Sequence, residues 1–198
     1  MALLAKSAGP EERRREAEAS LLEATERLLA KGNSYADLSI ERIAAEAGRS
    51  RTAFYLYFRD KRDLLMRLTE AVAGQMYEIA DRWWSGDDAV EDLHRALAEV
   101  LSSYREHRDA LRAVVEASGY DDEIGELWRG LVGRFIAATE GRLATIDGSQ
   151  PGVPGKAFAL VWMTERACYQ HVVREADLRD DELIEALLEI WVRAIYPA

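Results

Sequence analysis

The sequence contains little of what cross-links a chain or carries it through a membrane. Cys168 is the only cysteine among 198 residues, and there are four prolines. One thiol excludes a framework of intrachain disulfides, as is typical of proteins kept in a reducing compartment. No run of about 18 apolar residues occurs, because even the richest stretch, 158–173, is interrupted by Glu165 and Arg166. Residues 1–7 lack the pattern of a secretory signal peptide. We therefore expect a cytoplasmic protein without a membrane-spanning segment.

The sequence also lacks the motifs of common catalytic and cofactor sites. No Gly-rich phosphate loop occurs, and His94 and His107 have no second ligand at a metal-binding spacing. Cys168 and His171 stand three residues apart and are the one pair from which a thiolate or metal site could be drawn. A catalytic pair needs an orienting group and an oxyanion donor, and zinc needs more ligands than this stretch offers. We therefore expect no catalytic residue, no metal and no cofactor.

Apolar residues recur at helical spacing along the whole chain, and no strand-type alternation competes with them. The pattern predicts an all-α protein of about nine helices, punctuated by Ser, Asp, Gly and Pro. The longest break, 147–155, is polar and rich in Gly and Pro, and we expect a surface loop there. The expected helices cover 11–30, 40–47, a short segment starting at 51, 60–84, 88–106, 108–117, 121–146, 155–175 and 180–196.

Two of these helices form a helix-turn-helix pattern that is typical of DNA binding. Ser39 and Ser50 each precede a helical apolar pattern, where a hydroxyl can accept a hydrogen bond from the first turn. Between them lies Gly48, a residue that adopts a left-handed turn at little cost. Farther on, Asp60 precedes the next helix and has Asp63 three residues later, an arrangement resembling a capping box.

The N-terminal residues of the second helix of such a motif meet base edges, while flanking groups contact phosphates. Arg51 and Thr52 are therefore the candidates for base contacts, and Tyr55, Tyr57 and Lys61 are better placed for the DNA backbone. The full set of expected DNA-contacting residues is Ser39, Arg49, Ser50, Arg51, Thr52, Tyr55, Tyr57 and Lys61. A run of arginines at 13–15 lies among glutamates, and we interpret it as a solvated face.

The stretch from Ile43 to Lys61 resembles the DNA-binding domain of the TetR family of transcriptional repressors. It matches the family pattern Ile-Ala-x-x-Ala-Gly-x-Ser-x-x-x-Phe-Tyr-x-Tyr-Phe-x-x-Lys. The resemblance implies a three-helix helix-turn-helix head in residues 1–67 and a C-terminal helical bundle for ligand binding and dimerisation in 68–198. Segments 161–166 and 189–196 are similar to the mycobacterial subgroup typified by the repressor of ethionamide activation.

That subgroup has an apolar tunnel through its C-terminal bundle, and the resemblance implies a lining for it in this chain. The matching positions are Trp128, Val132, Phe135, Thr139, Val161, Thr164 and Trp191. Leu97, Leu101 and Tyr104 share one helix face and could close a wall of the same cavity, although ordinary core packing explains them equally well. Val161 and Thr164 stand where the subgroup has Asn, so a more lipophilic or a different ligand is expected.

The net charge of −10 is unevenly distributed, which reconciles it with DNA binding. Residues 1–67 hold 13 Lys and Arg against 11 Asp and Glu, whereas 68–198 hold 13 against 25. An acidic remainder repels DNA from surfaces that do not bind it.

The family fold implies a homodimer, and two adjacent helices, one with a helical stripe and one with an apolar band, could pair into a four-helix interface. The expected stripes are Trp162, Arg166, Tyr169 and Val173, and Leu183, Leu187, Ile190, Ala194 and Ile195.

The favoured function is a homodimeric repressor that binds double-stranded DNA at a palindromic operator and is released by a small apolar effector. One alternative is a DNA-binding regulator without small-molecule control. Another is a helical-bundle enzyme that would depend on Cys168 and His171.

Overall fold

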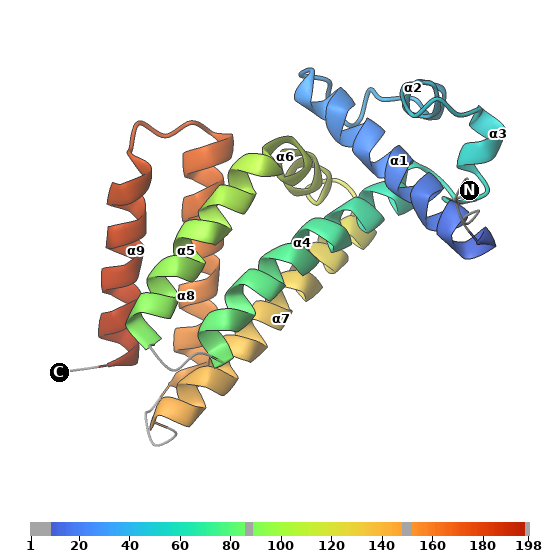
Figure 1. The fold of residues 1–198 in the computed structure, drawn as a ribbon. Helices are drawn as coiled ribbons and strands as arrows, with labels where there is room; N and C mark the ends of the chain where they lie inside the picture. Colours follow the sequence, from blue (N-terminus) through green and yellow to red (C-terminus); the bar gives the residue numbers. More distant parts are fainter. Residues whose placement is uncertain (1–8, 86–88, 148–151, 197–198) are drawn as a thin grey trace, which may run out of the picture. The chain divides into compact units, whose positions relative to one another are not determined.

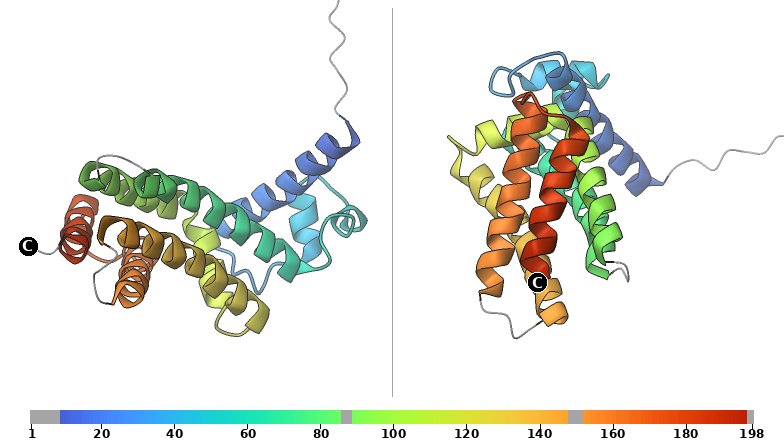
Figure 2. Two further views of the ribbon diagram at one scale, coloured as in Figure 1. Left: turned by 90° about the horizontal axis from the view of Figure 1, so that it is seen from below. Right: turned by 90° about the vertical axis from the view of Figure 1, so that its left-hand side faces the viewer.

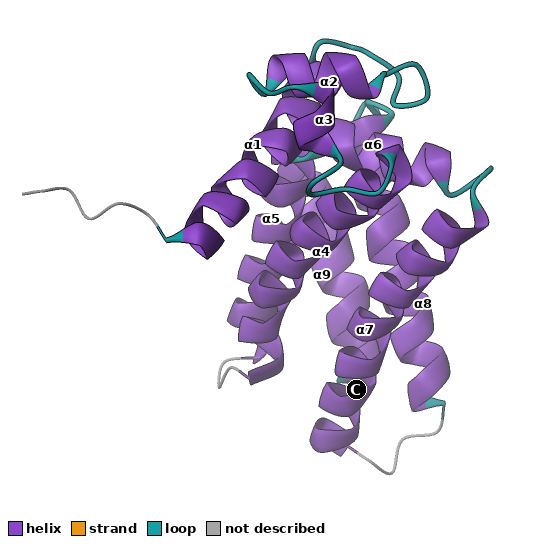
Figure 3. Cartoon of the chain, turned by 90° about the vertical axis from the view of Figure 1, so that its right-hand side faces the viewer, coloured by secondary structure: helices purple, strands orange, loops and turns teal. Residues whose placement is uncertain are grey.

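The computed structural model describes residues 9–85, 89–147 and 152–196, and within these ranges the chain is helical and contains no strand (Figures 1 and 3). The all-α prediction is confirmed. No helix of the described ranges is both long and apolar enough to cross a membrane. The chain divides into two compact units, which end and begin at Leu68 and Thr69. We call them unit 1 and unit 2.

Unit 1 forms around the apolar faces of short helices. Phe54, Leu21 and Ile43 are completely buried in its core, together with Leu64 and Leu65. Proline stands in the first turn of the first helix, where the missing amide costs nothing. The helices are α1 (Pro10–Ala30), α2 (Ile40–Glu46), α3 (Arg51–Phe54) and the start of α4 (Lys61–Ser85).

The expected capping residues of the helix-turn-helix are confirmed. The Ser39 hydroxyl accepts a hydrogen bond from the Arg42 amide at 3.2 Å, and the Ser50 hydroxyl accepts one from the Ala53 amide at 3.1 Å. Gly48 lies between the two helices with φ of +66°, in the left-handed region. These local signals fix where α2 and α3 begin.

Helix α4 begins with the reciprocal capping that the sequence predicts. The Asp63 amide donates to the Asp60 carboxylate at 2.8 Å, and the Arg59 amide donates to the Asp63 carboxylate at 2.9 Å. Two amides at the helix start are thereby satisfied, and the two carboxylates lie at the positive end of the helix dipole.

Unit 2 is a bundle in which α7 packs against α8, and α5 packs against α9 (Figures 1 and 2). The later part of α4 belongs to it as well. Helices α8 and α9 lie side by side as antiparallel neighbours (Figure 2). The further elements are α5 (Ala89–Glu106), α6 (Arg108–Ala117), α7 (Asp122–Asp147), α8 (Val153–Cys168), the π-helix η1 (Tyr169–Val173) and α9 (Asp180–Ile195).

The expected helix 155–175 has different ends in the structure. Helix α8 begins at Val153, because Pro154 is tolerated in a first turn and Gly152 adopts a φ of +77° before it. The loop predicted at 147–155 is therefore shorter, and its residues 148–151 lie outside the described ranges. At its other end the helix continues as η1, a change of hydrogen bonding that apolar spacing does not reveal.

Five of the nine residues in the stripes expected to form a dimer interface are buried within unit 2, so the stripes as a whole do not form one exposed face. Tyr169 and Val173 are buried inside unit 2, as are Leu183, Leu187 and Ile195. Side chains that fill the bundle cannot also meet a second copy. The large apolar side chains that stay exposed on α8 and α9 are Phe158, at 56% exposure, and Ile190, at 46%.

The left-handed turn at Gly48 predicts opposite effects for two Gly→Ala changes. An added methyl group has open space at Gly48 and at Gly130, which lies within α7. At Gly48 the positive φ should make alanine destabilising by about 1 kcal/mol, whereas at helical Gly130 alanine should stabilise by about 0.5–1 kcal/mol. Urea unfolding followed by circular dichroism measures both changes. Equal effects at the two positions would contradict the role of the turn.

Candidate DNA-binding and ligand-binding sites

The start of α3 presents the two residues expected to meet base edges. Arg51 and Thr52 are exposed, and the Arg51 guanidinium forms an ion pair with the Glu41 carboxylate of α2. Arg51 also donates to the Tyr55 hydroxyl at 3.4 Å. Exposed ion pairs of this kind contribute little stability, because solvent screens both charges. Arg51 can therefore exchange Glu41 for a DNA acceptor at small cost.

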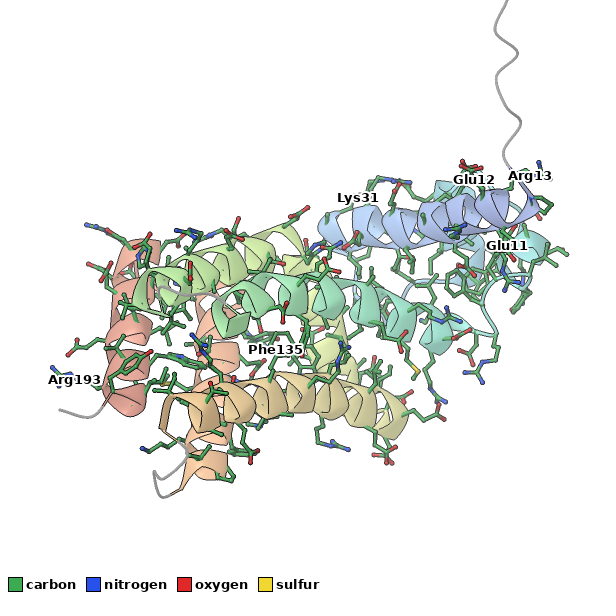
Figure 4. The ribbon with its side chains drawn as sticks, turned by 60° about the horizontal axis from the view of Figure 1, so that its bottom comes forward. Glu11, Glu12, Arg13, Lys31, Phe135 and Arg193 are labelled. Carbon is green, nitrogen blue, oxygen red and sulfur yellow. The ribbon has the colours of Figure 1, made fainter. Side chains whose placement is uncertain are left out.

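Of the residues expected at the DNA backbone, Tyr57 lines a polar depression of unit 1, whereas Tyr55 and Lys61 do not. Arg49 and Tyr57 contribute to it from the helix-turn-helix, together with Arg13 and Arg14 of α1. The Arg49 guanidinium also donates to the Ser20 hydroxyl at 2.8 Å. The arginines at the start of α1, where Figure 4 shows Arg13, are thus brought to the motif by the fold. The sequence pattern alone indicated a solvated face for these arginines, because it does not reveal which residues of the helix-turn-helix lie beside the start of α1.

Lys61 takes a different role from the phosphate contact that the sequence predicts. Its ammonium donates to three backbone carbonyl oxygens, those of Tyr35 at 2.9 Å and of Ala36 and Leu38 at 2.8 Å each. The Tyr35 hydroxyl donates in return to the Lys61 carbonyl. Burial lowers the pKa of Lys61, and the charge of Asp37 opposes that shift. All three ammonium donors are used within unit 1, so the side chain stabilises the turn before α2.

Unit 2 contains an apolar cavity of about 110 Å³ lined by residues of α4, α5, α6, α7, α8 and α9. Nine of the ten residues expected to line a ligand site lie around it: Leu97, Tyr104, Trp128, Val132, Phe135, Thr139, Val161, Thr164 and Trp191. Leu101 is buried but does not line the cavity. The cavity face of α5 runs through Leu93, Leu97 and Val100, and Leu101 is rotated away from its centre.

The sequence pattern did not identify several residues that line the cavity. Ala73, Met76 and Ala80 line it from α4, at the three- and four-residue steps of one helix face. Their spacing was visible in the sequence, but it does not tell a cavity wall from a packed core. Phe135 of α7, labelled in Figure 4, packs its ring against that of Tyr77 of α4, with ring centroids 5.3 Å apart.

Polar groups are few in this cavity. The Trp191 indole donates to the Thr164 hydroxyl at 2.9 Å, and that hydroxyl donates to the Leu160 carbonyl at 2.9 Å. The Thr139 hydroxyl and both carboxyl oxygens of Glu165 are buried without a hydrogen-bond partner. The cavity therefore offers a large apolar surface and a small number of unsatisfied polar atoms, as binding pockets commonly do.

Cys168 and His171 do not form a reactive pair. Burial, with a smaller contribution from the charge of Glu165, raises the pKa of Cys168 to about 12, so the thiol stays protonated at neutral pH. The His171 imidazole Nε2 lies 2.7 Å from the Asp180 carboxylate, which Arg105 also binds. This cluster joins η1 to the start of α9. Within the described ranges no group of three His, Cys, Asp or Glu side chains could hold a metal ion.

The carbonyl contacts of Lys61 predict a stability effect that is independent of DNA. Lys61→Met keeps the apolar stem but leaves three carbonyl oxygens without their donor, and should lower the free energy of unfolding by about 1–3 kcal/mol. Arg59→Met, at a side chain with 80% exposure, is the matched control and should change it by less than about 0.5 kcal/mol. Urea unfolding without DNA measures both. Equal stability of the two variants would mean that Lys61 does not stabilise unit 1 and would favour the phosphate contact that the sequence predicts.

Comparisons with known proteins agree with this arrangement. The family described as bacterial regulatory proteins, tetR family, matches residues 21–68, and the family described as transcriptional regulator EthR, C-terminal domain, matches 93–197. The HTH-type transcriptional regulator EthR of Mycolicibacterium smegmatis is 29% identical over 194 residues, covering 90% of this chain and 86% of that protein. EthR of Mycobacterium tuberculosis is 30% identical over 193 residues, with 90% and 87% covered.

Solved structures share the fold at lower identity. A putative TetR-family regulator from Syntrophomonas wolfei superposes with a TM-score of 0.75 and 21% identity, covering 93% of this chain and 97% of that one. FadR from Bacillus subtilis, in complex with stearoyl-CoA, gives a TM-score of 0.74 and 18% identity, with 91% and 98% covered. The chain therefore belongs to the TetR family of DNA-binding transcriptional regulators, with a C-terminal domain of the EthR type, and is not an enzyme.

Proposed function

We propose that this regulator is a homodimeric repressor that leaves a palindromic operator when a small lipophilic ligand enters unit 2. The observation that carries the proposal is the use of one helix by both units. Leu64 and Leu65 of α4 fill the core of unit 1, and Met76 of the same helix lines the cavity. A ligand that moves α4 therefore acts on an element of the DNA-binding unit. The protein acts where the chromosome lies, in the cytoplasm.

A second copy is needed for specific DNA binding. One helix-turn-helix buries too little surface for high specificity, whereas two half-sites separated by whole turns of DNA provide enough. Phe158 and Ile190 leave apolar surface exposed on the adjacent helices α8 and α9, with the Trp162 ring 6.4 Å from that of Phe158. This surface supports pairing of two copies about a twofold axis, and hence a palindromic operator.

Release requires that the ligand distinguish two states of the dimer. A molecule that prefers the state unable to bind DNA by about 2 kcal/mol shifts the equilibrium roughly thirtyfold. The apolar cavity supports a lipophilic molecule in this role. FadR of Bacillus subtilis, which holds stearoyl-CoA in its crystal structure, is a structural neighbour with a lipophilic ligand.

The alternative is a regulator in which unit 2 serves only for dimerisation. It predicts that lipophilic compounds neither stabilise the protein against heat nor change operator binding. The described cavity favours the ligand-responsive function, because a packed dimerisation domain would leave no such space.

The operator can be found by selecting genomic fragments on the purified protein and footprinting the enriched sequence at two salt concentrations. A protected palindrome with strong salt dependence is the expected result. Protection of a single half-site would exclude the dimeric mode, and the absence of enrichment would exclude operator binding by the free protein.

Arg51 should determine base preference at this operator. Arg51→Ala should weaken operator binding by about 1–3 kcal/mol and make binding less dependent on sequence. Arg95→Ala, which removes an exposed guanidinium from α5, serves as the control and should leave the affinity unchanged. Fluorescence anisotropy with operator and scrambled DNA measures both variants. Wild-type affinity and selectivity in Arg51→Ala would mean that another side chain contacts the bases.

Phe135 should affect the response to ligand more than the binding of DNA. Phe135→Ala removes one wall of the cavity. The concentration of a lipophilic compound that releases the operator should therefore differ from that of the wild type, while the affinity for the operator without ligand stays close to wild type. Leu143→Ala is the control, because Leu143 is buried in α7 but does not line the cavity. Both variants are tested by operator-release titration and thermal unfolding. The same altered response in both would indicate a general loss of packing.

A further inference from the structure

The cavity lining includes one carboxylate side chain, that of Glu165. Glu165 is the only lining residue with a formal charge, and no Lys, Arg or His lines the described cavity. Its side chain is 6% exposed, and both carboxyl oxygens are buried without a hydrogen-bond partner. Arg166 places its Nε 3.5 Å from the Glu165 carboxylate, which is an ion pair without a hydrogen bond. The Arg166 guanidinium also lies over the Tyr169 ring, 5.1 Å from its centre.

A carboxyl group in this position costs stability in the empty protein. Burying a polar group without a hydrogen-bond partner destabilises a protein, and does so more when the group is charged. Burial raises the pKa of Glu165, and the charge of Arg166 opposes the shift only in part. Within the described residues the ion pair with Arg166 offsets part of this cost, and no hydrogen bond adds to it. An unsatisfied group of this kind in a cavity is best explained by a partner that comes with the ligand.

The surrounding side chains determine which partner suits the carboxyl group. Trp128, Phe135 and Trp191 line the same cavity as Glu165, and so does Tyr104. Aromatic faces attract cations through their electron density, most strongly where water is excluded. Burial and the nearby Glu165 raise the pKa of Tyr104 well above its usual value, so the phenol adds no charge of its own at neutral pH. The carboxyl group and the rings thus favour a cation and disfavour an anion.

We infer that the effector of this regulator is a lipophilic amine, whose ammonium group binds the Glu165 carboxylate while its apolar part lies against the aromatic residues. The inference rests on the ligand response proposed above and specifies its chemistry. Fatty acids would bring a second carboxylate toward Glu165 and should bind poorly. Alcohols lack the charge that makes the hydrogen bond to a carboxylate strong.

Three probes with the same apolar body test this inference: phenylbutylamine, phenylbutanol and phenylbutanoic acid. Their affinities for the full-length protein are measured by isothermal titration calorimetry at neutral pH. The amine should bind at least about tenfold more tightly than the alcohol, as expected for one charge-assisted hydrogen bond in a buried site, and the acid should bind most weakly. This order in the wild-type protein needs no variant, so it does not depend on how well a variant folds.

Two matched substitutions assign the preference to Glu165. Glu165→Gln keeps the shape of the side chain and should bring amine affinity down to that of the alcohol, leaving alcohol affinity unchanged. Glu126→Gln removes an exposed carboxylate from α7 and should keep the wild-type order. Equal binding of amine and alcohol by the wild type, or an amine preference that survives in Glu165→Gln, would overturn the inference.

Operator release by the same probes separates this inference from the proposed function. If the alcohol releases the operator as well as the amine does, the protein is ligand-responsive and only the role of Glu165 is wrong. If none of the three probes binds, both the amine inference and the ligand response assigned to this cavity are overturned, while operator binding stands on its own test.

Discussion

The Lys61 ammonium, surrounded by three carbonyl oxygens of the turn before α2, fixes where helix α4 starts relative to the helix-turn-helix. The Asp60 and Asp63 carboxylates satisfy the amides at the same point, so the beginning of α4 is held from two sides. From there α4 continues to Ser85 and reaches the cavity through Met76. The proposed coupling of ligand and DNA depends on this continuity, because a helix transmits displacement along its axis better than a loop does.

The cavity combines two properties that stability alone would not favour. Apolar walls and open space reduce the packing of unit 2, since empty volume in a core costs stability. Glu165 and Thr139 add buried polar atoms without hydrogen-bond partners. Natural proteins keep such costs at functional sites, where a ligand restores what the empty state lacks. The apolar walls can supply affinity for many compounds, whereas Glu165 provides the means to choose among them.

Local chemistry explains what could be predicted from the sequence. Ser39, Ser50 and Asp60 act on amides within three residues of themselves, so their caps follow from adjacent residues alone. Apolar periodicity likewise located the helices to within a few residues. It failed at Tyr169, where η1 begins and the side chain turns into the bundle instead of toward a second copy. An apolar stripe on a helix indicates that this face is buried, but it does not show whether another helix of the same chain or a second copy covers it.

The sequence by itself determined the all-helical fold, the helix-turn-helix and its capping residues, because each depends on interactions within a few positions of the chain. Only the tertiary structure decided that Lys61 binds carbonyl oxygens more than 20 residues earlier, at Tyr35 to Leu38. It also decided that Leu101 packs in the core and that Glu165 lines the cavity without a hydrogen-bond partner. These outcomes depend on which helix faces meet across the bundle. That is set by the packing of side chains distant in sequence, which no local pattern records.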